Sequence, residues 1–282
     1  MLYHILKQLG IPATKCKLSA FQNAEDDSNY GAWLVETSDM SYVLKKAKGR
    51  EALNYKTYFS NLPSYAPILY ASIEVDGNIY LLMEYVPGHD LSKAQREDII
   101  LALDAMIAMQ EQYWQCDNSI ANDRYSGRAN RRNYLKEPTL EQAYDTYLAA
   151  FAEMPKTLCH DDLLPFNVII SQERAVLIDW EVAGILPYPT SLARLIAHCS
   201  EEDDAFFFMK ESDKAFAVDY YFNNFVAKKG ITRTQFDRDL ALCLLYEYCE
   251  WVYVGNKYPD ADQKRPAHYL KLALQHTKSC NF

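Results

Sequence analysis

The sequence is short of glycine and of basic charge. Only 9 of its 282 residues are glycine, and 29 lysines and arginines stand against 38 aspartates and glutamates, which gives a formal net charge of -9 at pH 7. Nucleic-acid backbones select basic surfaces, so this balance argues against nucleic acid as the main partner. It suits a cationic small molecule better, although many cytoplasmic proteins are equally acidic.

The sequence also lacks paired cysteines and long apolar runs. Its seven cysteines are scattered, with no CxxC pair and no zinc-ligand spacing, which favours reduced thiols in a cytoplasmic protein. No stretch approaches the roughly 20 apolar residues that a spanning helix needs. The N-terminal MLYHILKQLGIP has no basic region followed by a long apolar run. We therefore expect a cytoplasmic protein with no signal peptide and no membrane partner.

The first 85 residues predict a short helix at 2–9. Strands and one further helix follow it in the order β-β-β-α-β-β. Alternating and β-branched patterns then predict five strands, and a helix lies between the third and the fourth: 15–21, 30–37, 41–46, helix 50–60, 68–75 and 78–85. Asp76-Gly77 is a strong hairpin signal. This order predicts a mixed sheet with one helix, and Val86–Gly88 is a candidate linker.

After the linker the sequence is mainly helical. Apolar residues at helical spacing predict helices at 93–116, 140–154, 191–199, 203–229, 234–255 and 265–277. Short strand patterns lie at 157–159, 167–171 and 175–179. The length and the 49% of apolar residues suit two lobes with a sizeable core. We place the boundaries at 1–85, 86–88 and 89–282.

One segment carries most of the chemistry. Residues 160–167 read HDDLLPFN and residues 176–181 read VLIDWE, which predicts a loop, a strand, a turn and a second strand that ends in a carboxylate. Phosphoryl transfer needs a carboxylate to orient the attacking hydroxyl and take its proton, and oxygen ligands for magnesium. Asp162 suits the first role, and Asn167 and Asp179 offer the oxygens that Mg²⁺ prefers. Alternatively, Asp162 and Asn167 only cap turns.

The pattern HxDxxxxN, followed by a short hairpin and IDWE, resembles the catalytic core of the aminoglycoside phosphotransferase and choline kinase families, which are relatives of protein kinases. The resemblance implies an α+β, two-lobed protein-kinase-like fold, with a small mixed β-sheet lobe and a larger helical lobe. It makes Asp162 the catalytic base, and Asn167 and Asp179 the magnesium ligands. His160 would be a structural member of the catalytic loop, and Glu181 matches a family residue of less settled role.

The N-terminal region carries the same resemblance. Tyr42–Lys45 resembles the strand that delivers the phosphate-binding lysine, and Glu51 in the next helix would orient Lys45. The segment around Met83 resembles the family hinge, with Met83 behind the purine of ATP or GTP. Main-chain groups of three residues would hydrogen-bond that purine: Glu84, Tyr85 and Val86. The alternatives are a solvated lysine, and a buried strand followed by an ordinary turn.

Three features depart from the family pattern. Asp161 takes a position that is usually glycine, and we expect its side chain to point away from Asp162. The loop 19–29 has no glycine and carries three carboxylates, which would repel phosphates. Ser191 stands where the family often has an aspartate that braces the catalytic loop, so another group must brace it or the loop is looser.

Two acidic or aromatic stretches are candidates for acceptor binding, 201–204 and 246–253. Carboxylates and aromatic faces both attract cations. Glu247 and Glu250 lie three residues apart, near one face of a helix, and with Trp251 they are candidate contacts to a cationic acceptor. The alternatives are a solvated helix start for the first stretch and a helix packed in the core for the second.

Together these features predict an ATP- or GTP-dependent kinase that uses Mg²⁺. The expected acceptor is a hydroxyl of an amine-bearing small molecule such as an aminoglycoside, choline or a related amino alcohol, or of a sugar. A non-catalytic nucleotide-binding module is the alternative that the loop 19–29 suggests. A protein kinase is disfavoured, because no activation-loop sequence of the usual length follows Asp179 and no APE motif is present.

Overall fold

The structure is a computed structural model that describes residues 1–22, 29–93, 95–116, 124–172, 174–202, 207–260 and 263–280. The three carboxylates of the loop 19–29, and half of the acidic stretch 201–204, lie outside these residues. Within the described ranges, no helix is long and apolar enough to cross a membrane.

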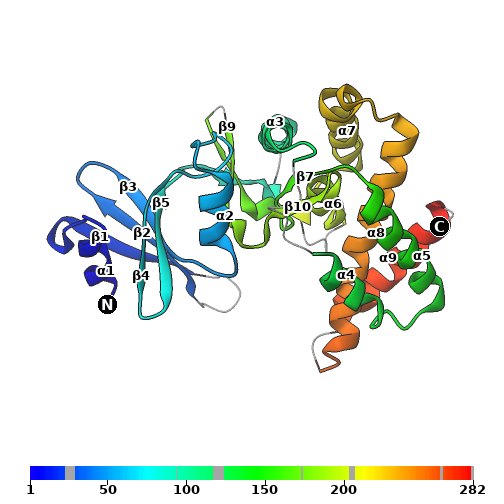
Figure 1. Ribbon diagram of the computed structural model, residues 1–282, viewed down its shortest axis with the longest axis horizontal. Helices are drawn as coiled ribbons and strands as arrows, with labels where there is room; N and C mark the ends of the chain where they lie inside the picture. The colour runs from blue at the N-terminus through cyan, green and yellow to red at the C-terminus, as the bar shows by residue number, and fades with distance from the viewer. Residues whose placement is uncertain are drawn as a thin grey trace.

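A five-stranded sheet forms the N-terminal lobe (Figure 1). Its strand order is β1-β2-β3-β5-β4, and each neighbouring pair is antiparallel. All five predicted strands are present: β1 (Cys16–Gln22), β2 (Asn29–Thr37), β3 (Ser41–Lys46), β4 (Leu69–Val75) and β5 (Asn78–Glu84). Asp76 and Gly77 both have positive φ, as a two-residue hairpin turn between β4 and β5 requires.

Different helices cover the two faces of this sheet. α1 (Leu2–Gln8) packs on the outer face, where it shares a small core with Leu44 and Leu82. α2 (Glu51–Tyr58) lies on the face toward the second lobe (Figure 1). Because side chains alternate along β5, Leu81 and Met83 point to this inner face and join the main core. The sheet therefore links two separate cores.

The second lobe is mainly helical and includes one helix that the sequence did not predict, α4. Its helices are α3 (Arg96–Gln112), α4 (Tyr125–Arg132), α5 (Pro138–Glu153), α6 (Thr190–Ala197), α7 (Glu211–Tyr221), α8 (Arg233–Lys257) and α9 (Lys264–Cys280). A π-helical turn at Phe222–Val226 and a 3-10 turn at Ala227–Lys229 continue α7. The predicted start of this segment at 203 is wrong, because α7 begins at Glu211 after a short strand.

Short strands connect the helices and carry the loops of interest. β6 (His89–Asp90), β8 (Val168–Ser171) and β9 (Arg174–Leu177) form one small sheet, and β7 (Lys156–Cys159) pairs with β10 (Gly184–Pro187). The remaining pair is β11 (Cys199–Ser200) with β12 (Phe207–Phe208). The β8–β9 hairpin is present as predicted, but β9 ends two residues before Asp179.

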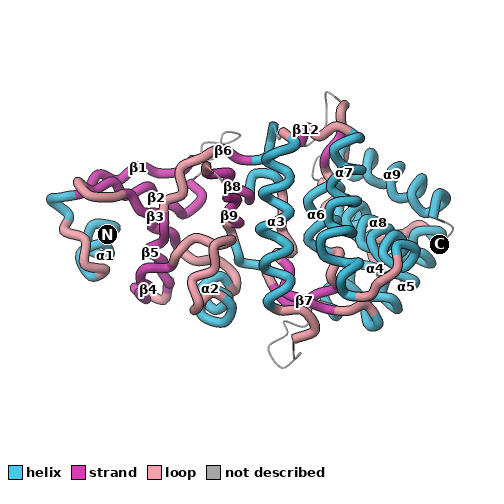
Figure 2. The backbone as a smooth tube through the Cα atoms, turned by 90° about the horizontal axis from the view of Figure 1, so that it is seen from above, coloured by secondary structure: helices cyan, strands magenta, loops and turns pink. Residues whose placement is uncertain are grey.

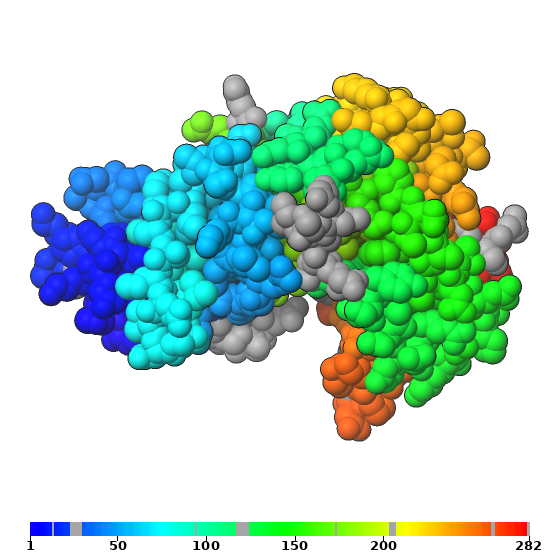
Figure 3. Space-filling view, viewed as in Figure 1, coloured from blue at the N-terminus to red at the C-terminus, as the bar shows by residue number. Residues whose placement is uncertain are grey.

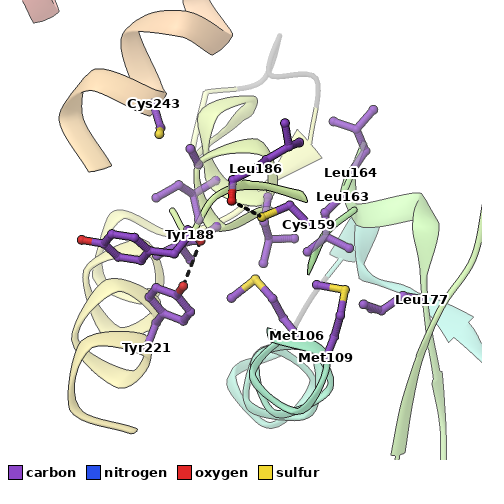
Figure 4. Packing of buried hydrophobic residues seen from close by; sticks show 14 of the residues in the cluster. Met106, Met109, Cys159, Leu163, Leu164, Leu177, Leu186, Tyr188, Tyr221 and Cys243 are labelled. Atoms are coloured by element: carbon purple, nitrogen blue, oxygen red, sulfur yellow. Dashed lines mark hydrogen bonds between the residues drawn. The ribbon is translucent and has the colours of Figure 1, made fainter. Parts of the chain in front are cut away.

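The main core runs from the inner face of the first sheet through the helical lobe. Figure 4 shows part of it, where Met106 and Met109 of α3 meet Cys159 of β7 and Tyr221 of α7. The Tyr221 hydroxyl donates to the main-chain oxygen of Tyr188 over 3.0 Å. This packing holds β7, and β7 leads directly into the loop at 160–167.

The two lobes lie side by side along the longest axis of the molecule. In the space-filling view the blue and cyan half contains the sheet, and the green-to-red half contains the helices (Figure 3). The tube view from above shows β8, β9 and α3 between them (Figure 2). The lobe boundaries at 1–85 and 89–282 stay a prediction, since buried residues of both parts, such as Leu81 and Leu103, belong to one core cluster.

Candidate active site

Lys45 connects the sheet to the second lobe through two ion pairs. Its Nζ atom lies 2.7 Å from Glu51 Oε1 and 2.9 Å from Asp179 Oδ1. Burial alone lowers the pKa of a lysine, but the two carboxylates outweigh it and raise the pKa of Lys45. Glu51 is fully buried, and in the part of the chain that the structure describes its Oε2 atom has no hydrogen-bond partner. The lysine therefore stays charged, at a place where α2, β3 and the second lobe meet.

Asp179 sits in a left-handed backbone conformation just beyond β9. Its φ and ψ are both 65°, which is uncommon for residues other than glycine, asparagine and aspartate. The next residue, Trp180, is fully buried and donates its indole N–H to the Leu177 oxygen over 2.7 Å. The chain thus turns sharply at Asp179 and presents its carboxylate to Lys45 while the tryptophan anchors the turn in the core.

The loop between β7 and β8 brings Asp162 and Asn167 together. The Asn167 Nδ2 atom donates to the main-chain oxygen of Asp162 over 2.8 Å and to its Oδ2 over 3.2 Å. These bonds use the amide nitrogen. The Asn167 amide oxygen, which is the atom that binds metals, has no protein partner in the described part of the chain.

The two adjacent aspartates of this loop belong to different ion pairs. Asp161 has a φ of 60° and accepts a 2.6 Å hydrogen bond from Arg128 of α4. Asp162 Oδ1 accepts from Arg194 of α6, from Nη2 at 2.7 Å and from Nε at 3.2 Å. The positive φ explains why glycine suits position 161, and aspartate tolerates this conformation better than most residues. As expected from the sequence, Asp161 turns to a partner other than that of Asp162.

His160 is buried and holds the loop at 160–167 in place through two hydrogen bonds. Its main-chain N–H donates to Ser191 Oγ over 3.1 Å, and its Nε2 donates to the Ile178 oxygen over 2.8 Å. Burial lowers the pKa of His160, so the ring is neutral at physiological pH. Ser191 of α6 therefore supports the loop through this hydrogen bond. It does so at the position where the family often has an aspartate.

Asn167 and Asp179 fit a magnesium ion by their chemistry. An amide oxygen and a carboxylate oxygen are hard ligands, and Mg²⁺ takes its remaining ligands from water and phosphates. Among the residues that the structure describes, no group of three or more histidines, cysteines, aspartates and glutamates could hold a metal. Asn167 and Asp179 would therefore supply only part of the ligands of the ion, and phosphate oxygens of a nucleotide and water would supply the rest.

The predicted hinge follows β5 directly. The Glu84 main-chain N–H already donates to the Ile68 oxygen over 2.8 Å. Tyr85 and Val86 leave the strand and make no main-chain hydrogen bond among the described residues. Met83 is buried, 4% exposed, beneath this segment. A purine would therefore find open main-chain groups after Glu84 rather than at its N–H.

A cavity of about 270 Å³ adjoins Asp162. Charged side chains dominate its wall, together with Val182 and Tyr246: Arg124, Arg131, Asp161, Asp162, Arg194, Glu247 and Glu250. The arginines come from α4 and α6 and the glutamates from α8. The cavity thus offers a place where a molecule could bring a hydroxyl to Asp162.

Two of the three predicted acceptor contacts line this cavity, but their charges are already matched. Glu247 is 2% exposed, and its Oε2 accepts from Arg194 Nη1 over 2.9 Å. Burial opposes ionisation of Glu247, yet Arg194 and His198 lower its pKa overall. Glu250 forms an ion pair with Arg131. Each of the two glutamates thus already has an arginine partner within the described chain.

The third predicted contact lies elsewhere. Trp251 does not line the cavity, because its ring stacks on Tyr269 of α9 with centroids 5.9 Å apart. The Arg265 guanidinium covers the same ring at 5.5 Å. Tyr246 is buried against Tyr147. Within the described residues, Tyr246 is therefore part of the core, and Trp251 packs against α9 away from the cavity.

Sequence reasoning missed the arginines of this site. Arg124, Arg128 and Arg131 recur at helical spacing and share one side of α4. Arg194 lies one turn after Ser191 on α6. Both spacings were visible in the sequence. They carried no signal for a buried role because arginine is usually solvated.

A protein-family model agrees with this geometry. The model of the phosphotransferase enzyme family matches residues 22–217, which is more than half of the chain. The comparison with curated protein sequences gives no significant match.

Solved structures match nearly the whole chain. A thermostable mutant of aminoglycoside phosphotransferase APH(4)-Ia, in ternary complex with ADP and hygromycin B, has a TM-score of 0.66 at 14% identity, over 98% of this chain and 97% of that one. Choline kinase from Cryptosporidium parvum Iowa II has a TM-score of 0.65 at 12% identity, over 99% and 95%. An aminoglycoside phosphotransferase from Alicyclobacillus acidocaldarius has a TM-score of 0.59 at 13% identity, over 95% and 92%.

At these identities the structural likeness shows a shared fold, which confirms the two-lobed, protein-kinase-like α+β fold expected from the sequence. The family model adds the assignment by sequence. The chain therefore belongs to the phosphotransferase enzyme family, with the fold of aminoglycoside phosphotransferases and choline kinases.

Proposed function

We propose that the protein is a small-molecule kinase that transfers the γ-phosphoryl group of ATP or GTP to a hydroxyl group. One observation carries this proposal. Lys45 is ion-paired to both Glu51 and Asp179, and this supports a role for Lys45 in binding the triphosphate next to Asp179 as a magnesium ligand. Phosphoryl transfer depends on this kind of positioned charge.

Each remaining part of the reaction has a candidate residue. Asp162 would orient the acceptor hydroxyl and take its proton. Asn167 and Asp179 would hold a magnesium ion, which neutralises charge on the phosphates. The hinge would bind the purine through main-chain groups of Tyr85 and Val86. Lys45 would steady the phosphates themselves.

The cavity beside Asp162 argues for a small acceptor. Its volume of about 270 Å³ lies just below the range of roughly 300–1,000 Å³ that is usual for drug-sized ligands. An amino alcohol or a single sugar ring suits this volume better than a whole aminoglycoside. The relatives of known fold include both a hygromycin B complex and a choline kinase.

A phosphorylation screen tests the proposal. The purified protein is assayed with Mg-ATP and Mg-GTP against choline, ethanolamine, hydroxy acids, monosaccharides and aminoglycosides. On the acceptor found, Asp162→Asn should lower kcat by roughly 10²–10⁴-fold without weakening nucleotide binding in calorimetry. Asp179→Ala should also nearly abolish turnover, through loss of the metal.

Asp237→Asn serves as the matched control, because Asp237 only makes an exposed ion pair with Arg233 on α8. Its turnover should equal that of the wild type. Wild-type turnover by Asp162→Asn would refute the proposed base. Nucleotide binding with no phosphorylation of any acceptor would instead support a non-catalytic nucleotide-binding module.

A further inference from the structure

The carboxylates around the cavity are each matched by a cation of the protein itself. Asp161 pairs with Arg128, and Asp162 pairs with Arg194. On α8, Glu247 pairs with the same Arg194, and Glu250 pairs with Arg131. Because Arg194 is shared, three arginines face these four carboxylates, and Arg124 in the same wall brings the formal charge to zero. A wall without net charge has little electrostatic preference for a cationic ligand.

Arg124 differs from the other arginines of the wall. Its Nη2 atom donates to the Val182 oxygen over 2.5 Å, but it makes no ion pair with a carboxylate of the described chain. Its Nε atom is buried and has no hydrogen-bond partner among the described residues, which do not include 117–123. Burial is the main cause that lowers the pKa of Arg124, and Arg128 and Arg50 lower it further, although Asp161 opposes them. An arginine nevertheless stays protonated.

The half-buried Arg124 guanidinium has N–H donors left over for an anion. Removing a charged group from water is costly unless a counter-charge and hydrogen bonds compensate it. Val182 fixes the orientation of the Arg124 guanidinium, so its other N–H groups are preorganised for carboxylate or phosphate oxygens. Glu250 shifts the charge of the cavity wall toward positive. Burial raises the pKa of Glu250 to about 7, so this carboxyl carries only part of its negative charge at neutral pH.

We propose that Arg124 is the subsite for an anionic group on the acceptor, which would be an alcohol that also bears a carboxylate or a phosphate. This inference rests on the proposed function for the direction of binding: the anion would lie at Arg124 and the hydroxyl at Asp162, two residues that line the same small cavity. It replaces the cationic acceptor that the sequence alone suggested, because Glu247 and Glu250 are already paired.

Matched pairs of acceptors provide the test. Glycerate is compared with glycerol, gluconate with glucose, and glycerol 3-phosphate with glycerol. Both turnover and equilibrium binding are measured, the latter by calorimetry in the presence of Mg-ADP. We expect the anionic member of at least one pair to bind about tenfold more tightly or better, as a charged hydrogen-bonded pair implies. The carboxylate and phosphate pairs separate the two kinds of anion.

Arg124→Gln should remove this preference. It should raise the KM or Kd of the anionic acceptor by roughly 10–100-fold while kcat and the KM of the nucleotide change little, and Arg124→Lys should restore part of the affinity. Arg132→Gln on the same helix is the matched control, because Arg132 pairs with Glu141 and Asp145 and does not line the cavity. It should behave as the wild type.

Three results would overturn the inference. They are tighter binding of the neutral members, binding of no anionic member, and a loss of nucleotide affinity in Arg124→Gln, which would assign the residue to the nucleotide phosphates. Arg124-dependent binding of an anion without turnover would support the subsite while counting against the kinase reaction. The failure of one proposal is thereby distinguishable from the failure of the other.

Discussion

The two consecutive aspartates in the loop before β8, Asp161 and Asp162, are paired with different arginines. Arg128, which holds Asp161, is 1% exposed, donates to the Tyr147 hydroxyl over 3.0 Å and lies over the Tyr246 ring. The Arg194 that holds Asp162 is shared with Glu247. A buried charge that loses its partner costs about 3–5 kcal/mol. The geometry of the catalytic loop therefore depends on two arginines from two different helices.

Glu250 gives a prediction at the scale of one titrating group. Burial raises its pKa from 4.5 to about 7, although Arg131 opposes the shift. The folded protein then holds a proton that the unfolded chain has lost between these two values. Stability should consequently fall as the pH rises from about 4.5 to 7, and this loss should level off above that range.

Glu250→Gln should remove this contribution. Thermal unfolding at pH 5 and pH 8 measures it: the drop in Tm between these pH values should be larger for the wild type than for the variant. Equal drops in the two proteins would show that Glu250 titrates normally in the folded state.

At the level of secondary-structure elements, Gly88 lets the chain after β5 lie close to the backbone of β8. A Cβ atom at Gly88 would lie 2.0 Å from the Ile170 oxygen, closer than any real contact. The next two residues form β6, which pairs with β8. Glycine is therefore needed here for close approach of two backbones, and not for an unusual φ.

Gly88→Ala should destabilise the protein by about 1–3 kcal/mol, the usual cost of overpacking, or more if β6 detaches. Gly127→Ala in α4 is the matched control. Its nearest neighbour would be Arg131 Nη1 at an ordinary 3.5 Å, so the better helix propensity of alanine should stabilise by about 0.5–1 kcal/mol. Urea unfolding measures both, and a shift of the same sign in both variants would contradict this account.

The elements differ in how visible they were in the sequence. Helices with a long apolar stripe, such as α3 and α8, and strands flanked by turn residues, such as β4 and β5, were predicted. α4 was not, because its sequence YSGRANRR contains no apolar stripe and includes glycine. Its partners are acidic and aromatic residues far away in the chain, including Asp161 and Tyr246. A helix held in this way has no local signature.

At the scale of the whole molecule, α2 joins the two lobes at the site. Asn54 is 2% exposed and donates its Nδ2 to the Trp180 oxygen over 2.7 Å, and the Arg50 N–H donates to the Glu181 oxygen over 3.2 Å. Lys45 adds its ion pair with Asp179. These contacts converge on the turn that carries Asp179, so the position of the carboxylate depends on how the lobes dock.

Asn54→Ala should lower the free energy of unfolding by about 1–3 kcal/mol, because the buried Trp180 oxygen loses its 2.7 Å bond and keeps a long 3.5 Å bond from the Ala183 N–H. It should also lower kcat, since the Asp179 turn loses a support. The control is Asn78→Ala, which removes a hydrogen bond within the β4–β5 turn and should cost less than about 1 kcal/mol. Equal stability loss in the two variants, measured in urea, would argue against Asn54 as a link between the lobes.

Those candidate site residues that lie close together in the chain could be predicted from the sequence. Asp162 and Asn167 lie five residues apart in one loop, so their spacing alone brings them together. The β-β-β-α-β-β order likewise follows from periodicity and turn residues within short segments. The pairing of Lys45 with Glu51 was predicted by the resemblance to the family and is present in the structure.

Which charges of the cavity wall are paired depends, by contrast, on contacts that only the folded structure contains. Whether Glu247 faces a ligand or an internal arginine depends on the packing of α6 against α8, and Arg124 has its place through Val182, which is 58 residues away. A carboxylate looks the same in the sequence whether it is free or paired. Its charge becomes available or neutralised only when the fold brings a second charge within hydrogen-bond distance.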